Sequence, residues 1–183
     1  MPDVSTSLRR WLPSMSAIDQ LCPSCGLCCN GVLFGDVELQ RGDDAKKLAA
    51  LGVALFSKGR KKVFNQPCAC LTGGLCGIYA DRPARCRAFD CRALQRVQLG
   101  EITAAAAHKS IAEAKRHSTE VLRLVRALGD ANETQPLNRR YAAIMAQPMD
   151  LAGDEAQLEL RGELMLAVGR LVEVLERDFL TPG

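Results

Sequence analysis

Residues 22–29 read Cys22-Pro-Ser-Cys25-Gly-Leu-Cys28-Cys29 and place four thiols within eight residues. A proline and a glycine beside closely spaced cysteines are typical of a metal-binding turn. Glycine tolerates the positive φ that lets backbone N–H groups point at thiolates. Adjacent side chains diverge, so we expect Cys28 and Cys29 to face different partners.

The spacing of Cys22, Cys25 and Cys28 repeats the C-x2-C-x2-C run that holds three corners of a [4Fe-4S] cluster in bacterial ferredoxins. Ferredoxins continue with three residues and then Cys-Pro, whereas here Cys29 follows at once. A fourth ligand is therefore expected elsewhere in the chain or at Cys29 itself.

Five further cysteines follow, at Cys68, Cys70, Cys76, Cys86 and Cys91, and none comes after Cys91. In a reducing compartment, clustered thiols are better explained as metal ligands or catalytic thiols than as disulfides. Asp81 is expected to cap a helix with Pro83 in its first turn, which would place Cys86 on the exposed N-terminal half, where a thiolate is favoured.

The N-terminus carries a twin-arginine pair, Arg9-Arg10, which would matter if the chain were exported. Pro13, Ser14, Ser16 and Asp19 interrupt the apolar stretch that a signal peptide needs. No segment approaches the roughly 18 apolar residues of a membrane span. We therefore expect a cytoplasmic protein that does not enter the membrane.

Composition favours helices around this cysteine region. The chain has 183 residues, of which 48% are hydrophobic and only 4% aromatic, so its core is expected to consist of aliphatic side chains. The predicted fold is mainly α, with a small irregular cysteine-rich metal-binding region containing short strands, packed on a C-terminal helical scaffold. We place an N-terminal extension at 1–20, a cysteine-cluster domain at 21–100 and the scaffold at 101–183.

Individual elements follow from periodicity and from capping residues. Short strands are expected at 31–34 and around 63–64, and a helix from Asp43 or Asp44 through Leu51. Apolar stripes predict helices over 101–128, 137–144 and 160–179. We interpret these stripes as intramolecular core rather than as an oligomer seam.

A family resemblance follows from the motif C-x2-C-x2-C-C and the later pattern C-x-I-Y-x2-R-P-x2-C-R-x3-C. Together they resemble the YkgJ-like cysteine-cluster proteins, described as zinc- or iron-chelating, over about residues 20 to 92. The resemblance implies eight ligands: Cys22, Cys25, Cys28, Cys29, Cys68, Cys76, Cys86 and Cys91. Cys70 is then an extra thiol, either a bystander or a local substitute for Cys68.

The metal is a separate question, because thiolate suits both zinc and iron. Eight thiolates could close two zinc sites, or hold one [4Fe-4S] cluster with four thiols left over or in a second site. The ferredoxin-like run favours an iron–sulfur cluster, with zinc as the alternative. A flagellin lysine N-methylase is similar through the same domain, so protein methylation is kept as the enzyme alternative, although no nucleoside site is recognisable. No catalytic residue is assigned.

Basic residues crowd the cysteine region, at Lys58, Arg60, Lys61, Lys62, Arg82, Arg85, Arg87, Arg92 and Arg96. We expect them to compensate the charge of the metal centre rather than to bind nucleic acid, because aromatic residues for base stacking are few. The resemblance points to Arg82 and Arg87 beside the ligands, with Tyr79 as a hydrogen-bonding or packing group. Any partner is expected to be another protein.

Other polar residues are expected to play ordinary structural roles. His108 and His117 are interpreted as surface or core residues rather than ligands. The acidic stretch of Asp36, Glu38, Asp43 and Asp44 is interpreted as a solvated loop and a helix start.

Overall fold

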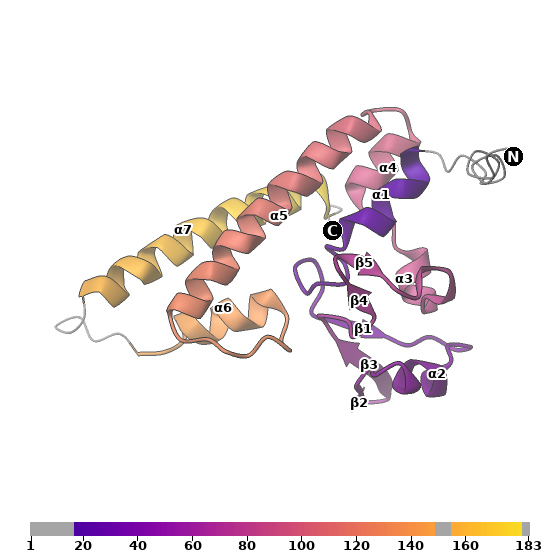
Figure 1. The fold of residues 1–183 in the computed structure, drawn as a ribbon, viewed down its shortest axis with the longest axis horizontal. Coiled ribbons are helices and arrows are strands. Elements are labelled where there is room, and N and C mark those ends of the chain that lie inside the picture. Colours follow the sequence, from indigo (N-terminus) through magenta and orange to yellow (C-terminus); the bar gives the residue numbers. More distant parts are fainter. Residues whose placement is uncertain (1–16, 149–154, 181–183) are drawn as a thin grey trace, which may run out of the picture.

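The computed structural model describes residues 17–148 and 155–180, which form a helical bundle beside a small sheet region (Figure 1). The helices are α1 (Ala17–Cys25), α2 (Ala45–Ala50), α3 (Ala84–Ala88), α4 (Arg92–Gln98), α5 (Ala104–Ala127), α6 (Leu137–Met145) and α7 (Glu155–Asp178), with a 3₁₀ turn η3 at Tyr79–Asp81. The strands are β1 (Asp36–Glu38), β2 (Leu55–Lys58), β3 (Lys61–Asn65), β4 (Leu71–Thr72) and β5 (Leu75–Cys76). The predicted fold class is confirmed. Arg9-Arg10 and most of the extension predicted at 1–20 lie outside the described residues.

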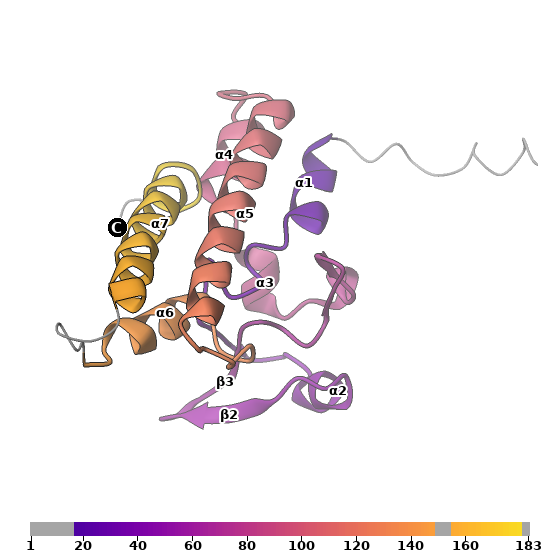
Figure 2. The same ribbon diagram turned by 60° about the vertical axis from the view of Figure 1, so that its left-hand side comes forward.

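The two long helices α5 and α7 lie side by side and form the spine of the molecule (Figure 2). They run antiparallel, because Arg177 of α7 pairs with Glu113 of α5 at 2.9 Å, while Arg123 of α5 pairs with Glu163 of α7 at 3.5 Å. Their facing stripes bury Val121, Leu124, Leu164, Leu171 and other aliphatic residues, as the periodicity predicts. Helix α5 begins at Ala104 rather than at 101, because the Thr103 hydroxyl accepts a hydrogen bond from Ala106 N.

Shorter helices attach the cysteine region to this spine. Helices α1 and α4 pack on α5, and Arg92 N at the start of α4 donates to Phe179 O just after α7. At the other end, Leu137 N of α6 donates to Gly31 O, two residues after Cys29. The scaffold therefore holds the cysteine segment at both of these points.

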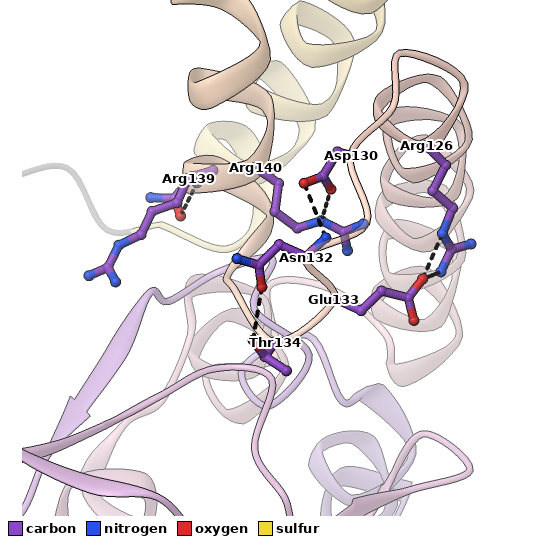
Figure 3. A network of polar contacts seen from close by, with 8 residues as sticks. Arg126, Asp130, Asn132, Glu133, Thr134, Arg139 and Arg140 are labelled. Atoms are coloured by element: carbon purple, nitrogen blue, oxygen red, sulfur yellow. Dashed lines mark hydrogen bonds and ion pairs between the residues drawn. The ribbon is translucent and has the colours of Figure 1, made fainter.

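A polar network closes the connection between α5 and α6 (Figure 3). Arg140 Nε donates to Asp130 Oδ2 at 2.6 Å, and the two side chains are 4% and 12% exposed. Close by, Arg126 pairs with Glu133, but both of these side chains are exposed. The two ion pairs thus have similar partners in very different environments.

The sheet region is a three-stranded antiparallel sheet in the order β1-β3-β2, with a separate β4–β5 hairpin. Val37, Phe64 and Leu48 bury a second, smaller core between sheet and α2, and Asp44 caps α2 through Lys47 N. The strand predicted around 63–64 is confirmed within β3. The strand predicted at 31–34 is wrong, because Gly31 has a φ of +81° and the Asn30 side chain accepts from Val32 N, which makes this segment a turn.

The helix around Cys86 also begins differently from the prediction. Asp81 belongs to η3, and Pro83 lies at the N-cap of α3 rather than in its first turn. The carboxylate that binds the start of α3 comes from Asp43, whose Oδ1 accepts from Ala84 N at 2.8 Å. The same carboxylate accepts from Gln40 N through its other oxygen, so Asp43 joins two segments far apart in sequence.

No helix among the described residues is both long enough and apolar enough to cross a membrane.

Candidate metal centre

The first cysteine run begins on a helix and continues into a tight turn. Cys22 and Cys25 lie in the last part of α1, which includes Pro23, so this proline is part of a helix rather than of a turn. Gly26 ends the helix with a φ of +73°, and its carbonyl accepts from Cys29 N at 2.9 Å. A Cβ at Gly26 would lie 2.7 Å from Gly74 O, so the turn packs directly against the β4–β5 hairpin. This contact brings the two cysteine-rich segments together.

A cavity of about 480 Å³ lies between these segments. Its walls combine thiols with apolar side chains, including Leu33, Ile111 and the edge-to-face pair Phe34 and Phe89, whose ring centroids are 4.7 Å apart. Seven of the nine cysteines line it: Cys22, Cys25, Cys28, Cys29, Cys76, Cys86 and Cys91. Cys68 and Cys70 do not line it.

We use the name first thiol group for four of these thiols: Cys22, Cys25, Cys28 and Cys91. Burial raises the pKa of Cys22 to about 11, and the charges of Cys91 and Cys25 act in the same direction. Burial likewise raises the pKa of Cys28, reinforced first by Cys25 and then by Cys91. These side chains are therefore electrostatic neighbours, although Cys91 is remote from the others in sequence.

Backbone N–H groups are directed at two sulfurs of this group. The Leu27 N–H is hydrogen-bonded to the Cys25 thiol, and the Ala93 and Leu94 N–H groups at the start of α4 are bonded to Cys91. These bonds favour the thiolate, but burial is the larger influence and the pKa of both thiols is raised. Bonds of this kind to sulfur also stabilise a thiolate that ligates a metal.

The second thiol group comprises Cys29, Cys68, Cys76 and Cys86. Burial raises the pKa of Cys29 to about 12, and its charged neighbours are Cys76, Cys68 and Cys86 in that order. Burial raises the pKa of Cys86 to about 11, with Cys76 as its strongest thiol neighbour. Cys70 is buried in the smaller core and is hydrogen-bonded to Cys68, behind this group.

Arg82 is the cation that both groups share. Its charge lowers the pKa of Cys22 in the first group and of Cys29 and Cys86 in the second, against the larger effect of burial. The guanidinium lies 3.6 Å from the centre of the Tyr79 ring and donates to Tyr79 O at 2.8 Å. These contacts fix its position.

The charge of Arg87 also lowers the pKa of Cys86, against the larger effect of burial. Arg87 in addition donates a hydrogen bond to Arg82 O at 2.6 Å. Two basic residues of the β2–β3 hairpin do not compensate the charge of the metal centre as expected. Lys58 and Lys61 instead pair with Asp36 and Glu38 on β1. This pairing also corrects the interpretation of those two carboxylates as a solvated loop: they lie on a strand.

Lys115 on α5 is a site residue that the sequence did not indicate. Its Nζ donates to Ser24 O at 2.9 Å, and its charge lowers the pKa of Cys25, against burial. It lies 91 residues from Ser24 in sequence, so no local pattern could have identified it. Of the two histidines, His108 is exposed and His117 lies 4.0 Å from Glu113; neither lines the cavity.

The donor chemistry fits a thiophilic metal. The thiols surround the cavity rather than meet at one point, and across residues 17–148 and 155–180 no three Cys, His, Asp or Glu side chains are already close enough to hold a single ion. Closely grouped thiols with raised pKa values repel one another once deprotonated, and a bound cation removes that repulsion. Arg82 lines the cavity, and Lys115 lies outside the lining but close enough to Cys25 for its charge to lower the pKa of that thiol, against burial.

Residues 21–118, more than half of the chain, match a protein family named CxxCxxCC and described as a "putative zinc- or iron-chelating domain". The chain belongs to the CxxCxxCC family. Comparisons with curated proteins and with solved structures gave no match.

The CxxCxxCC match reaches further than the resemblance seen in the sequence. It extends past Cys91 through α4 and the first part of α5, and so includes Lys115. The CxxCxxCC domain is thus a metal-chelating unit in which part of the helical spine contributes to the site.

Proposed function

We propose that this CxxCxxCC protein binds an iron–sulfur cluster through the first thiol group. The observation that carries the proposal is the position of Cys91. It supplies a fourth thiol beside Cys22, Cys25 and Cys28, whose spacing is that of ferredoxins. The sequence left this fourth ligand open.

The surroundings of the first thiol group support a cluster rather than a single small ion. Its thiols line a cavity of about 480 Å³, which leaves room for several metal and sulfide atoms. Bound there, the cluster would supply one-electron chemistry. Apolar side chains form much of the cavity wall, and N–H groups of Leu27, Ala93 and Leu94 stabilise charge on sulfur.

Purification without oxygen, followed by measurement of iron, acid-labile sulfide and zinc per chain, tests the proposal. We expect iron and sulfide in comparable amounts, with a brown absorbance that bleaches on reduction. Colourless protein that carries zinc and no sulfide would refute the iron–sulfur assignment and make the domain a zinc-chelating module.

Two variants connect this result to the named residues. Cys91→Ser is expected to remove the visible absorbance. Cys70→Ala is the matched control, because Cys70 is a buried thiol that does not line the cavity. This variant is expected to leave the absorbance unchanged. Equal effects from the two variants would contradict the assignment of Cys91.

A further inference from the structure

We infer that the exposed face of α7 is an interface with a second copy of this chain, in which two α7 helices pack antiparallel. The inference goes beyond the proposed function and does not depend on it. No residue of α7 lines the cavity, and Phe179, which does, follows the helix.

One face of α7 presents apolar side chains to solvent. Met165 and Leu166 are 62% and 66% exposed, and Val172 is 37% exposed. By the helical repeat, these residues lie on the side of α7 opposite to Leu164 and Leu171, which are buried in the helical core. Figure 2 shows α7 at the outer edge of the molecule, with α5 and α6 on its inner side. We use the name outer stripe for this face: Leu158, Gly162, Met165, Leu166, Gly169 and Val172.

Two glycines within the outer stripe fit a contact between helices. A Cβ at Gly162 or Gly169 would meet open space, so packing within the chain does not require glycine at either position. Glycine also weakens an exposed helix relative to alanine. On a contact face, however, it lets two helix backbones approach closely, because the distance between helix axes depends on the side chains between them.

Charges along one flank of the outer stripe favour a second copy of the same helix. Glu159 and Arg170 lie on this flank, and neither forms an ion pair with another described residue. In an antiparallel pair with its two-fold axis at Met165, equal flanks of the two helices face each other. Glu159 of one copy then lies opposite Arg170 of the second copy, and the symmetry forms this pair twice.

The same two-fold axis also matches the apolar residues. It places Leu158 of one copy opposite Val172 of the second, and the two Met165 side chains opposite each other at the centre. The helix dipoles are then opposed, which is favourable. One axis position thus satisfies both the charged flank and the apolar stripe.

A parallel pair of α7 helices fits this pattern less well. It would align identical residues, so Glu173 would lie against its own copy and the pairs between Glu159 and Arg170 would be lost. In the antiparallel pair Glu173 comes near Glu155 of the second copy, but only at the exposed end of the contact, where Arg170 is close by. The antiparallel orientation is therefore the one that the charges favour.

The dimer keeps the two cysteine regions apart. Phe179 lies fourteen residues beyond Met165, so an antiparallel pair separates the two Phe179 positions by about 40 Å along the helices. One helix pair also buries less surface than the roughly 1,600 Å² of a standard interface. We therefore expect a reversible dimer that dissociates on dilution.

The test is sedimentation of the metal-loaded, full-length protein over a range of protein concentrations. Glu159→Arg places positive charges opposite each other and Arg170→Glu places negative ones, so each variant alone should associate about tenfold more weakly than wild type. A mixture of the two variants makes both contacts attractive again and is expected to form a heterodimer. The double variant Glu159→Arg/Arg170→Glu is expected to recover self-association. This recovery also shows that the variants fold.

A matched pair of apolar substitutions tests the outer stripe itself. Leu166→Gln should weaken self-association at least about tenfold. Leu99→Gln is the control, because Leu99 is 74% exposed but lies at the end of α4, and it should leave association unchanged.

Two results would overturn the inference. Wild-type protein that stays monomeric over the whole concentration range would leave the outer stripe to a different protein. A dimer that Leu166→Gln does not weaken, or charge variants that fail to complement each other in the mixture, would place the contact on another surface.

Discussion

Replacing Asp130 with alanine is expected to lower the free energy of unfolding by about 3–5 kcal/mol, the usual cost of leaving one partner of a buried ion pair uncompensated. The Arg140 side chain is only 4% exposed, so removing Asp130 takes away the counter-charge of a buried cation. One terminal nitrogen of Arg140 already lacks a hydrogen-bond partner within the described residues. The carboxylate also accepts from Asn132 N, and that bond is lost as well.

The exposed pair in the same network provides the control (Figure 3). Arg126 and Glu133 are 54% and 61% exposed, so Glu133→Ala is expected to cost less than about 1 kcal/mol. Urea unfolding followed by circular dichroism, on full-length protein of equal metal content, measures both. The double variant Asp130→Ala/Arg140→Leu removes both buried charges and should be more stable than Asp130→Ala alone. Equal losses for Asp130→Ala and Glu133→Ala would refute the reasoning.

Three further predictions concern the site and its supports. Arg82→Gln should lower the reduction potential of the proposed cluster, by roughly 40 mV for each kcal/mol of interaction lost, because a cation stabilises the reduced state. Redox titration of this variant, with Arg82→Lys as the charge-conserving control, measures the shift. An unchanged potential in Arg82→Gln would exclude this role of Arg82. Gly26→Ala should reduce both stability and metal content, because the new Cβ would lie 2.7 Å from Gly74 O. Gly100 is the control, because its φ of +74° is nearly equal but a Cβ there would meet open space. Gly100→Ala should therefore cost only the backbone strain of about 1–2 kcal/mol. Burial alone would raise the pKa of Asp178, but the hydrogen bonds of its carboxylate outweigh burial, so the pKa is lowered. Asp178 therefore stabilises the fold above its unfolded pKa of about 3.9. This contribution to stability is lost as pH falls through the lower folded pKa. Asp178→Asn should therefore cost about 1–3 kcal/mol at pH 7 in urea unfolding and little in strong acid, and a difference that does not depend on pH would contradict this.

The helices of the scaffold could be predicted because their signals are local. A stripe that includes Ile111, Val121 and Val125 repeats every three or four residues, and that spacing alone indicates one buried face. Asp44 likewise acts within its own helix turn. Strand β2 and helix α4 were missed, because their short apolar patterns stand inside a segment dominated by cysteine, glycine and charge.

The composition of the site could be predicted only in part. The motif pointed to the cysteines and to Arg82, but it could not show that Cys91 lies near Cys22 and Cys28, since that depends on how segments remote in sequence pack. Lys115 and Asp43 reach the site from positions remote in sequence. A linear pattern carries no signal for such contacts.

The family match ends at residue 118, in the middle of α5, which continues without a break to Ala127. The end of the family match therefore does not coincide with a boundary between structural elements. Because α5 is one continuous helix, the part of it that packs on α7 is rigidly connected to Lys115 and, through the hydrogen bond to Ser24 O, to the last turn of α1. A chain truncated at residue 118 would lack Val121, Leu124 and Val125, which are buried in the helical core, so the family match by itself does not delimit a unit with a complete core.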